Sequence, residues 1–390
     1  MRGLKLGAAA VAVGLLAAAC SSSSSSSKSS SGSTGTTTGA NPAASSAKYS
    51  ASHPLKIGFI LQGPVTDGGF NSAIYAGIKQ MQQQYGSAVQ VTYKENVPET
   101  PQSSQVIDSL IQDGNEAIVT TSFGFHTYAV QAAQTNPKVS FMQWESTETA
   151  PNLSEYYFDI DESWYLAGLA AGAATKNGKI GMLASFPIPG VLVQVDGFAL
   201  GVAATNPTAT VRVVWLNSFY DPPKATEAAK SLVSSGADTL ANVLDDASVV
   251  QVAESNKLPV VGHDLDQEKF GPTSWLTGAN FVFGPYFTKQ VGDLINGQWK
   301  GNDNYIGDSK DGSTTISPFG PRYTQAVPTD VQAKIQQRQD QFKAGTFNVW
   351  TGPISDQSGA VQVPDGQSLT PVQQQQIHYL VKNVLGTITK

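Results

Sequence analysis

Short apolar runs alternate with longer amphipathic stretches along most of this chain, and this alternation restricts its fold more than any other feature. From Leu55 onward, LKIGFIL precedes NSAIYAGIKQMQQQYG, VQVTYKE precedes TPQSSQVIDSLIQDG, and EAIVTT precedes HTYAVQAAQTNP. An apolar run of this length followed by helical periodicity predicts a strand and then a helix. Repeated units of this kind form a parallel sheet with helices on both faces.

A second series of the same units begins near Trp164 and continues to GANF at 278–281. Two successive series predict an α/β protein with two doubly wound parallel-sheet lobes, because about 340 residues are too many for one ordinary core. The stretch FGPYFTKQVGDLINGQW predicts a helix that returns from the second lobe to the first, so the lobes would share a hinge. Further helices are expected from Thr329 to Ala344 and from Thr370 to Leu385. The predicted lobes are 53–162 plus about 284–312, and 163–283 plus parts of 313–390, which include a C-terminal segment that crosses the hinge.

The N-terminus has the layout of a cleaved export signal, with Arg2 and Lys5 before an apolar stretch that is too short to span a bilayer. Cys20 follows LLAAA, which resembles the lipobox of bacterial lipoproteins. Residues 1–20 are therefore predicted to be a lipoprotein signal peptide, with Cys20 as the lipidation site. The alternative is an ordinary signal peptide with a chance cysteine. Residues 21–52 are rich in Ser, Thr, Gly and Ala and predict a disordered tether.

Charge and motif content argue against several classes of function. The net charge is −6 and no Lys/Arg cluster occurs in the folded part, which argues against a nucleic-acid partner. Cys20 is the only cysteine, and the four histidines are scattered, so no metal site or cofactor is expected. No nucleophile elbow or phosphate-binding loop is present. The remaining enzymatic alternative is a nucleoside hydrolase that holds calcium with aspartates such as Asp245, Asp246, Asp264 and Asp266.

Aromatic and carboxylate side chains follow nearly every predicted strand. Ligands of open α/β sheets bind at the carboxyl ends of strands, and in two facing lobes these ends would line one cleft. Aromatic faces favour a flat ligand, while carboxylates and amides bind its polar edge. Inter-lobe packing and helix capping are the alternative roles, and capping is favoured for Asp221. The candidate ligand-binding residues are Asp67, Phe70, Asn71, Phe123, Trp144, Phe186, Phe219, Asp245, Asp264 and Asn280.

Six segments in order resemble the basic membrane lipoprotein family of ABC importer substrate-binding proteins, which have the type I periplasmic-binding-protein fold. They are KIGFILQGPVTDGGFN, YLAGLAAGAATKNGKIG, VDGFALG, NSFYDPPKATEAAKSLVSSGADTL, GHDLDQ and TGPISDQSGAVQVPDGQSLT. The resemblance implies that a purine base or nucleoside stacks between aromatic rings, with an aspartate on the base edge. It places Asp67, Phe70, Asn71 and Phe123 at the ligand in the first lobe, and Phe186 and Asp264 in the second. Asn280 stands near the place where the nucleoside-binding branch has a ribose-contacting lysine, which favours a free base.

The predicted function is thus non-enzymatic capture of a purine base or nucleoside for an ABC permease, by a monomer anchored through lipid to the outer face of the cell membrane. The alternative is a ligand-sensing surface receptor or adhesin lipoprotein that is not coupled to transport. A hinged trap would close because the ligand makes more contacts in the closed form.

Overall fold

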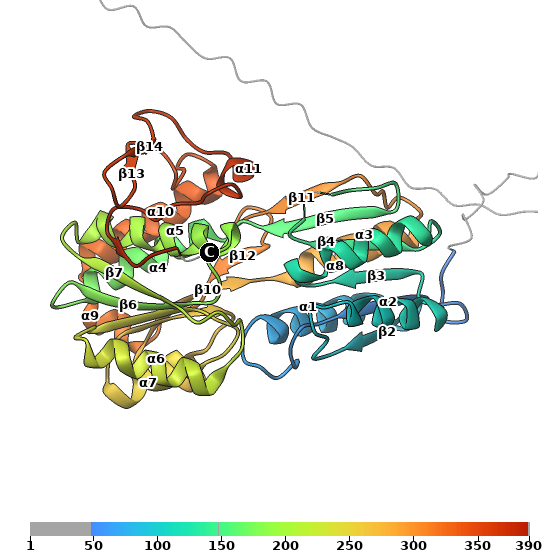
Figure 1. Ribbon diagram of the computed structural model, residues 1–390, viewed down its shortest axis with the longest axis horizontal. Helices are drawn as coiled ribbons and strands as arrows, with labels where there is room; N and C mark the ends of the chain where they lie inside the picture. Colours follow the sequence, from blue (N-terminus) through green and yellow to red (C-terminus); the bar gives the residue numbers. More distant parts are fainter. Residues whose placement is uncertain (1–47, 147, 389–390) are drawn as a thin grey trace, which may run out of the picture. The chain divides into compact units, whose positions relative to one another are not determined.

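The computed structural model describes residues 48–146 and 148–388. In this part of the chain there are two lobes, each built on a mainly parallel β-sheet with helices on both faces (Figure 1). The predicted fold class is confirmed. The predicted signal peptide, Cys20 and most of the predicted tether lie outside the described residues.

The first lobe contains a sheet of six strands, all of them parallel. Both of its faces are covered, and accordingly β1 (LKIGFI) buries every residue except Lys56. In spatial order the strands are β11 (Asn304–Gly307), β5 (Leu153–Phe158), β4 (Ser140–Trp144), β3 (Ala117–Thr120), β1 (Leu55–Ile60) and β2 (Val89–Lys94). The helices of this lobe are α1 (Phe70–Tyr85), α2 (Gln102–Gln112), α3 (His126–Thr135) and α8 (Phe283–Ile295), with short 3-10 turns η1 (Gly86–Ala88) and η2 (Phe123–Phe125).

The second lobe contains a sheet of seven strands, in which only β12 runs antiparallel to its neighbour. In spatial order the strands are β12 (Thr314–Ile316), β10 (Trp275–Phe281), β9 (Val260–Asp264), β8 (Thr239–Val243), β6 (Lys179–Ala184), β7 (Thr210–Trp215) and β15 (Val384–Leu385). The helices are α4 (Asp161–Ala174), α5 (Pro189–Thr205), α6 (Pro222–Ser234), α7 (Ser248–Asn256), α9 (Pro321–Ala326), α10 (Thr329–Ala344) and α11 (Pro371–Gln374), with η3 (Glu268–Phe270) and a small hairpin, β13 (Ile354–Ser355) and β14 (Val361–Val363).

The strand order places a ligand-binding position in each lobe. Taking the first five strands of each lobe in chain order, the spatial order is 2-1-3-4-5 in both. In such sheets the connections leave in opposite directions on either side of the first strand, and a crevice opens at the carboxyl ends of the first and third strands. These strands are β1 and β3 in the first lobe, and β6 and β8 in the second.

The chain crosses between the lobes three times. It passes from β5 to α4, from β10 to α8, and from β11 to β12. The second crossing confirms the returning helix, because α8 packs against α1 of the first lobe. Three adjacent crossings form the hinge.

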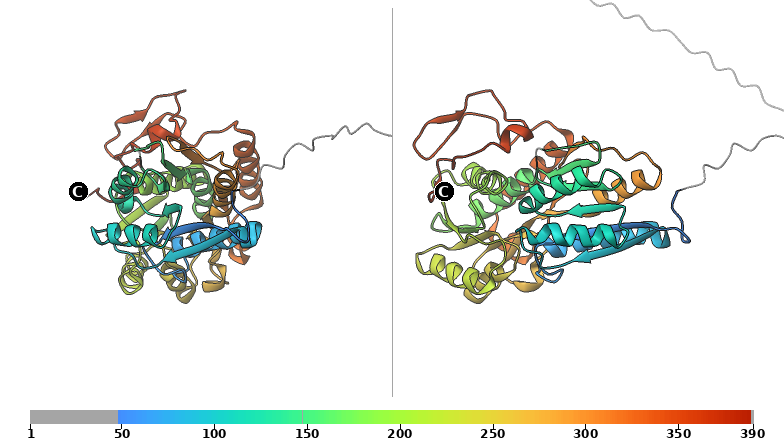
Figure 2. Two further views of the ribbon diagram at one scale, coloured as in Figure 1. Left: turned by 90° about the vertical axis from the view of Figure 1, so that its right-hand side faces the viewer. Right: turned by 45° about the vertical axis from the view of Figure 1, so that its right-hand side comes forward.

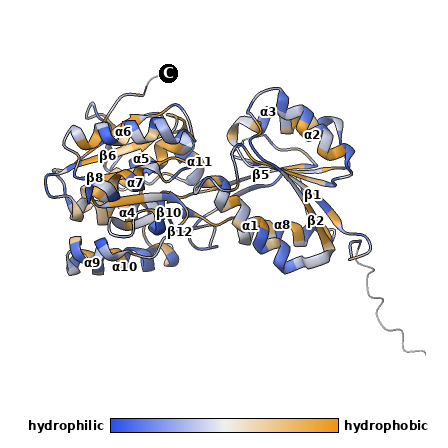
Figure 3. Cartoon of the chain, turned by 90° about the horizontal axis from the view of Figure 1, so that it is seen from below, coloured by the Kyte–Doolittle hydropathy of each residue, from blue (hydrophilic) through white to orange (hydrophobic). Residues whose placement is uncertain are grey.

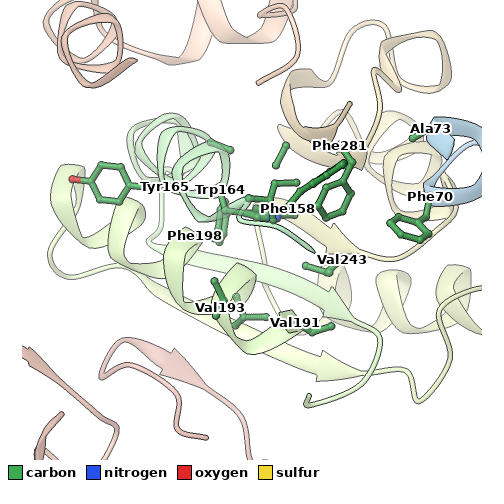
Figure 4. Close-up of a cluster of buried hydrophobic side chains, with 14 of the residues drawn as sticks. Phe70, Ala73, Phe158, Trp164, Tyr165, Val191, Val193, Phe198, Val243 and Phe281 are labelled. Atoms are coloured by element: carbon green, nitrogen blue, oxygen red, sulfur yellow. The ribbon is translucent and has the colours of Figure 1, made fainter. Parts of the chain in front are cut away.

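One continuous apolar core runs through both lobes. It includes Phe70 and Phe158 from the first lobe and Trp164 and Phe198 from the second (Figure 4). Helices α4 and α5 consist largely of apolar residues, whereas α10 is mainly hydrophilic (Figure 3). The close packing of α4 on α5 requires Gly201, since a Cβ there would overlap the carbonyl oxygen of Tyr165.

Several predicted segments need correction. Tyr49 lies inside the predicted tether, but it is buried and donates a hydrogen bond of 2.9 Å to Glu116 Oε2, so it belongs to the folded part. Strand β5 was not predicted, although its six residues are all buried.

The predicted helix at 329–344 is confirmed, whereas the one at 370–385 is wrong. Only Pro371–Gln374 is helical, and the rest of the segment lies over α5 (Figure 2). Val384 pairs with Val211 as an edge strand, so tertiary contacts override the helical periodicity. Among the described helices, none combines the length and the hydropathy that a membrane span requires.

Candidate functional site

A pocket lies between the two lobes, at the carboxyl ends of their strands. The first lobe contributes residues that follow β1, β3 and β4, and the second contributes residues that follow β7 and β8 together with the N-terminal part of α5. The crevice at the carboxyl ends of the first and third strands of each sheet therefore opens into this pocket. The lining residues are Gln62, Phe70, Ser122, Phe123, Trp144, Glu145, Tyr157, Ile188, Gly190, Val191, Gln194, Phe219, Val243, Asp245, His263 and Phe281.

The turn into α1 is shaped by Asp67 and presents Phe70 to the pocket. Asp67 is buried, and its two carboxylate oxygens accept hydrogen bonds from the backbone N–H groups of Gly69, Asn71 and Ser72 at 2.8–3.0 Å. The Asn71 side chain also donates to Asp67, at 2.8 Å, and accepts from the backbone of Gly63. Neither Asp67 nor Asn71 lines the pocket. In the structure these two predicted site residues hold the turn, and the Phe70 ring faces the cavity.

Aromatic rings form much of the pocket wall. Phe70 packs edge-to-face with Trp144 and Phe281, with ring centroids 5.5 and 5.6 Å apart. Such pairs fix the ring orientations. Phe123 differs from these three because 45% of its surface is exposed, and Phe219 enters the pocket from the second lobe. Rings from both lobes therefore face the same cavity.

Two carboxyl groups reach the pocket, one from each lobe. Asp245 lies after β8, and its Oδ2 accepts a hydrogen bond of 2.7 Å from Gln62 Nε2 of the first lobe. Glu145 lies after β4, next to the N-terminal turn of α5, where a Cβ at Gly190 would overlap its carboxylate. Burial, together with the nearby charge of Glu155, raises the pKa of Glu145 to about 7. Burial also raises the pKa of Asp245 well above its usual value, with the charges of other carboxylates adding to the effect.

His263 and Asp264 lie at the end of β9, and only His263 lines the pocket. Their Nδ1 and Oδ1 atoms are 3.1 Å apart, but burial lowers the pKa of His263 to about 3, so the imidazole is neutral and the contact is not an ion pair. Asp264 has a φ of 69° and Glu145 a φ of 53°. Left-handed backbone at non-glycine residues is costly and is concentrated at functional sites. Both residues end strands that point at the cleft.

Not all predicted site residues line this pocket. Phe70, Phe123, Trp144, Phe219 and Asp245 do so. Phe186 instead packs against Phe219, with centroids 5.1 Å apart, while Asp264 is fully buried behind the wall. Asn280 exchanges hydrogen bonds of 2.8 and 3.0 Å with Ser317. The capping role of Asp221 is confirmed, because it accepts a hydrogen bond from the backbone of Lys224.

The sequence interpretation missed several lining residues. Gln62 and Phe281 stand in the strand-end segments QGPV and GANF, so their positions were available as a signal. Tyr157 comes from the unpredicted strand β5, and Gln194 from the second turn of α5. Tyr157 and Gln194 therefore lie outside the loops after predicted strands from which the candidate residues were chosen.

Two doubly wound lobes joined by three crossings, with a pocket between their strand ends, define the type I periplasmic-binding-protein fold. Residues 55–345 match the family model described as Bmp, ABC transporter substrate-binding protein PnrA-like. The chain belongs to this family. It is a family of substrate-binding proteins, not of enzymes.

Individual relatives agree with this assignment. The chain is 32% identical over 317 residues to a purine-binding protein of Brucella abortus (strain 2308), covering 81% of this chain and 89% of the relative. It is 30% identical over 250 residues to a Haloferax volcanii protein provisionally named an ABC transporter glucose-binding protein, covering 64% and 63%. Among solved structures, an ABC transporter solute-binding protein from Aeropyrum pernix K1 superposes with a TM-score of 0.66 at 16% identity, over 78% of this chain and 93% of that one, which concerns the fold alone.

Proposed function

We propose that the inter-lobe pocket binds a purine base or a purine nucleoside, and that the chain delivers this ligand to an ABC permease. The observation that carries the proposal is the enclosure of one pocket by aromatic rings from both lobes, with a carboxyl group from each lobe beside them. The relative named as a purine-binding protein supports the same ligand class.

The chemistry of the wall suits a flat, nitrogen-rich ring. Stacking of a base on an aromatic side chain contributes about 1–3 kcal/mol, and Phe123 and Phe219 offer one ring from each lobe. Carboxylates such as Asp245 and Glu145 accept hydrogen bonds from ring N–H and amino groups. The Gln62 and Gln194 side chains also line the pocket, where their amides are bonded within the chain and help to hold its wall. The pocket can therefore satisfy both the faces and the edge of a purine.

A free base is favoured over a riboside. Asn280, the residue nearest to the expected ribose contact, is bonded to Ser317 and does not line the pocket. A sugar is the second candidate, because carboxylates also bind hydroxyl groups and the Haloferax volcanii relative is named for glucose.

Delivery to a permease implies that the chain works outside the cytoplasm. We infer that Cys20 is acylated and holds the chain on the outer face of the membrane, with residues 21–47 forming most of the tether. The short apolar stretch before Cys20 and the Ser-rich segment after it support this arrangement.

A thermal-shift screen with bases, nucleosides, sugars and amino acids tests the ligand class. A ligand that binds only the folded state stabilises it by RT ln(1 + [L]/Kd), so the cognate ligand raises the melting temperature. We expect a rise with adenine, guanine or hypoxanthine and a smaller rise with their ribosides. A rise only with sugars or amino acids would refute the purine assignment and leave the family unchanged.

A further inference from the structure

An outer cavity adjoins the inter-lobe pocket on the side of the C-terminal segment. It has a volume of about 330 Å³, and its walls come from the residues after β3 and β4, from the start of α5, and from α11 with the two residues that follow it. Phe123, Glu145 and Ile188 line both this cavity and the inter-lobe pocket. The two cavities therefore meet at these three side chains.

The wall that α11 contributes lies outside the part of the chain that matches the family model, which covers residues 55–345. A capping box holds this short helix, in which Gln373 Oε1 accepts a hydrogen bond of 2.9 Å from the backbone N–H of Thr370. The helix contacts α5, and Ile377, three residues after its end, is 2% exposed. Val372 is therefore presented to the outer cavity by a fixed element.

Apolar side chains from all three walls line the outer cavity. They are Phe123 from the first lobe, Ile188 and Pro189 from the second lobe, and Val372 from α11. Phe123 is 45% exposed and Val372 is 54% exposed, although both are large apolar side chains. An exposed apolar patch that lines a hollow is typical of a ligand-binding groove.

Several polar side chains around the outer cavity are already bonded within the chain or solvated. His126 Nδ1 lies 3.2 Å from the carbonyl oxygen of Phe123, and Ser146 Oγ accepts a hydrogen bond of 3.1 Å from the backbone N–H of Glu148. Glu148 and Gln376 are exposed. An apolar group suits this cavity better than a sugar, because the hydroxyl groups of a sugar lose their hydrogen bonds to water against apolar walls.

We propose that the chain binds purine bases that carry an apolar substituent on the ring, with the base in the inter-lobe pocket and the substituent in the outer cavity. The inference rests on the proposed function, which places the base. The substituent passes Phe123 and Ile188, where the cavities meet, and contacts Val372 beyond them. Val372 is then a specificity-determining residue that the C-terminal segment supplies.

The affinity should increase with the length of the substituent. Each CH₂ group that leaves water on binding raises the association constant by up to about fourfold. A cavity of about 330 Å³ has room for several such groups. A binding site that ended at the base would exclude them, and the affinity would fall with the first added carbon.

Isothermal titration calorimetry of the full chain tests the inference. The probes are adenine, guanine and hypoxanthine, together with their ethyl and butyl derivatives substituted at N7 or N9. These positions lie on the imidazole edge and leave the opposite edge of the base to the carboxyl groups of the pocket. For at least one base and position, we expect the ethyl derivative to bind at least as tightly as the free base and the butyl derivative to bind more tightly.

Two variants of the C-terminal segment locate the substituent. Val372→Asp places a charge against it, which should lower the ratio of the butyl to the free-base association constant about tenfold or more. The exposure of Val372 makes this variant compatible with folding. Val361→Asp makes the same change at an exposed position of the same segment that does not line the cavity, and it should keep the wild-type ratio.

The outcomes separate this inference from the purine assignment. Binding of a free base together with weaker binding of all its alkyl derivatives would overturn the inference and leave the purine assignment intact. The same ratio in Val372→Asp and Val361→Asp would also overturn it, because the C-terminal wall would then not contact the substituent. If no purine bound, with or without a substituent, the proposed function itself would fail, and the inference with it.

Discussion

The two lobes have the same strand order but differ in what covers their helices. In the first lobe, α2 and α3 each bury three residues, and their outer faces are open to solvent. In the second lobe, α4 and α5 each bury twelve. The difference arises because α10 packs on α4 and the segment after α11 packs on α5, where Asp196 accepts a hydrogen bond of 3.0 Å from the backbone of Val381. A helix with a second partner no longer needs a polar face, so α4 and α5 are buried more completely than α2 and α3, whereas α6 of the second lobe also buries only three residues.

Removal of residues 346–390 should give the largest effect, because it exposes the outer face of α5. The described part of the segment contributes eight buried apolar side chains: Val349, Trp350, Ile354, Val363, Ile377, Leu380, Val381 and Val384. At about 1.5–3 kcal/mol for each, the loss is more than about 10 kcal/mol, which is comparable to the whole stability of a domain. We expect loss of cooperative urea unfolding, measured by circular dichroism. Val361→Ser, at an exposed position of the same segment, should unfold like the wild type. A shortened chain that still unfolded cooperatively would show that this cover is dispensable.

A methyl group at Gly201 should harm the second lobe more than one at Gly58 harms the first. At Gly201 the new Cβ would overlap the backbone oxygen of Tyr165, which cannot move without displacing α4. We expect Gly201→Ala to lower the free energy of unfolding by about 3 kcal/mol despite the better helix propensity of alanine. At Gly58 the contacts, at 3.0 Å, are side-chain methyl groups of Ile118 and Leu110, which can shift, so Gly58→Ala should cost about 1 kcal/mol. If urea titrations gave the same loss of unfolding free energy for both variants, the two lobes would not differ in their tolerance of a methyl group at these glycines.

Ligand binding should depend on rings from both lobes in spite of their different support. Phe123→Ala and Phe219→Ala should each weaken purine binding by about 1–3 kcal/mol, measured by calorimetry. Tyr220→Ala is a suitable control, because Tyr220 is exposed beside Phe219 and does not line the pocket. If only one of the two phenylalanine variants lost affinity, the ligand would be stacked on a single lobe and the enclosed arrangement would be wrong.

The smallest expected effect is the pH dependence of binding through Glu145. A purine N–H that donates to Glu145 requires the ionised carboxylate, whose pKa is about 7 in the empty pocket. Protons therefore compete with the ligand, and the association constant should fall by up to about tenfold for each pH unit below 7 and level off above it. Glu145→Gln should remove this component of the profile. The opposite trend, weaker binding above pH 7, would mean that a protonated Glu145 donates to the ligand.

The sequence predicted the architecture better than the site. Alternating apolar and amphipathic runs were enough for the lobes and for α10, because parallel strands and surface helices have distinct periodicities. Strand β5 was not predicted because its sequence, LSEYYF, contains polar residues such as Glu155, which only tertiary packing buries. Asp67 and Asn71 were placed at the correct turn, but only the structure shows that their hydrogen bonds are used within it. Periodicity cannot tell which side chain of a loop faces the cleft.

Two hydrogen bonds connect the lobes directly. Gln62 donates to Asp245 across the cleft, and Gln267 donates to the carbonyl of Gly68 at 2.8 Å, and neither bond involves a ligand. Both bonds stabilise the observed placement of the two lobes. In the proposed function, a larger fraction of molecules in the binding-competent conformation raises the apparent affinity for the ligand. In the proposed transport role, the same bonds would make empty and loaded chains more alike to a permease. Gln62 and Gln267 would then raise the affinity for the ligand while they lower the difference between the two states that a permease can recognise.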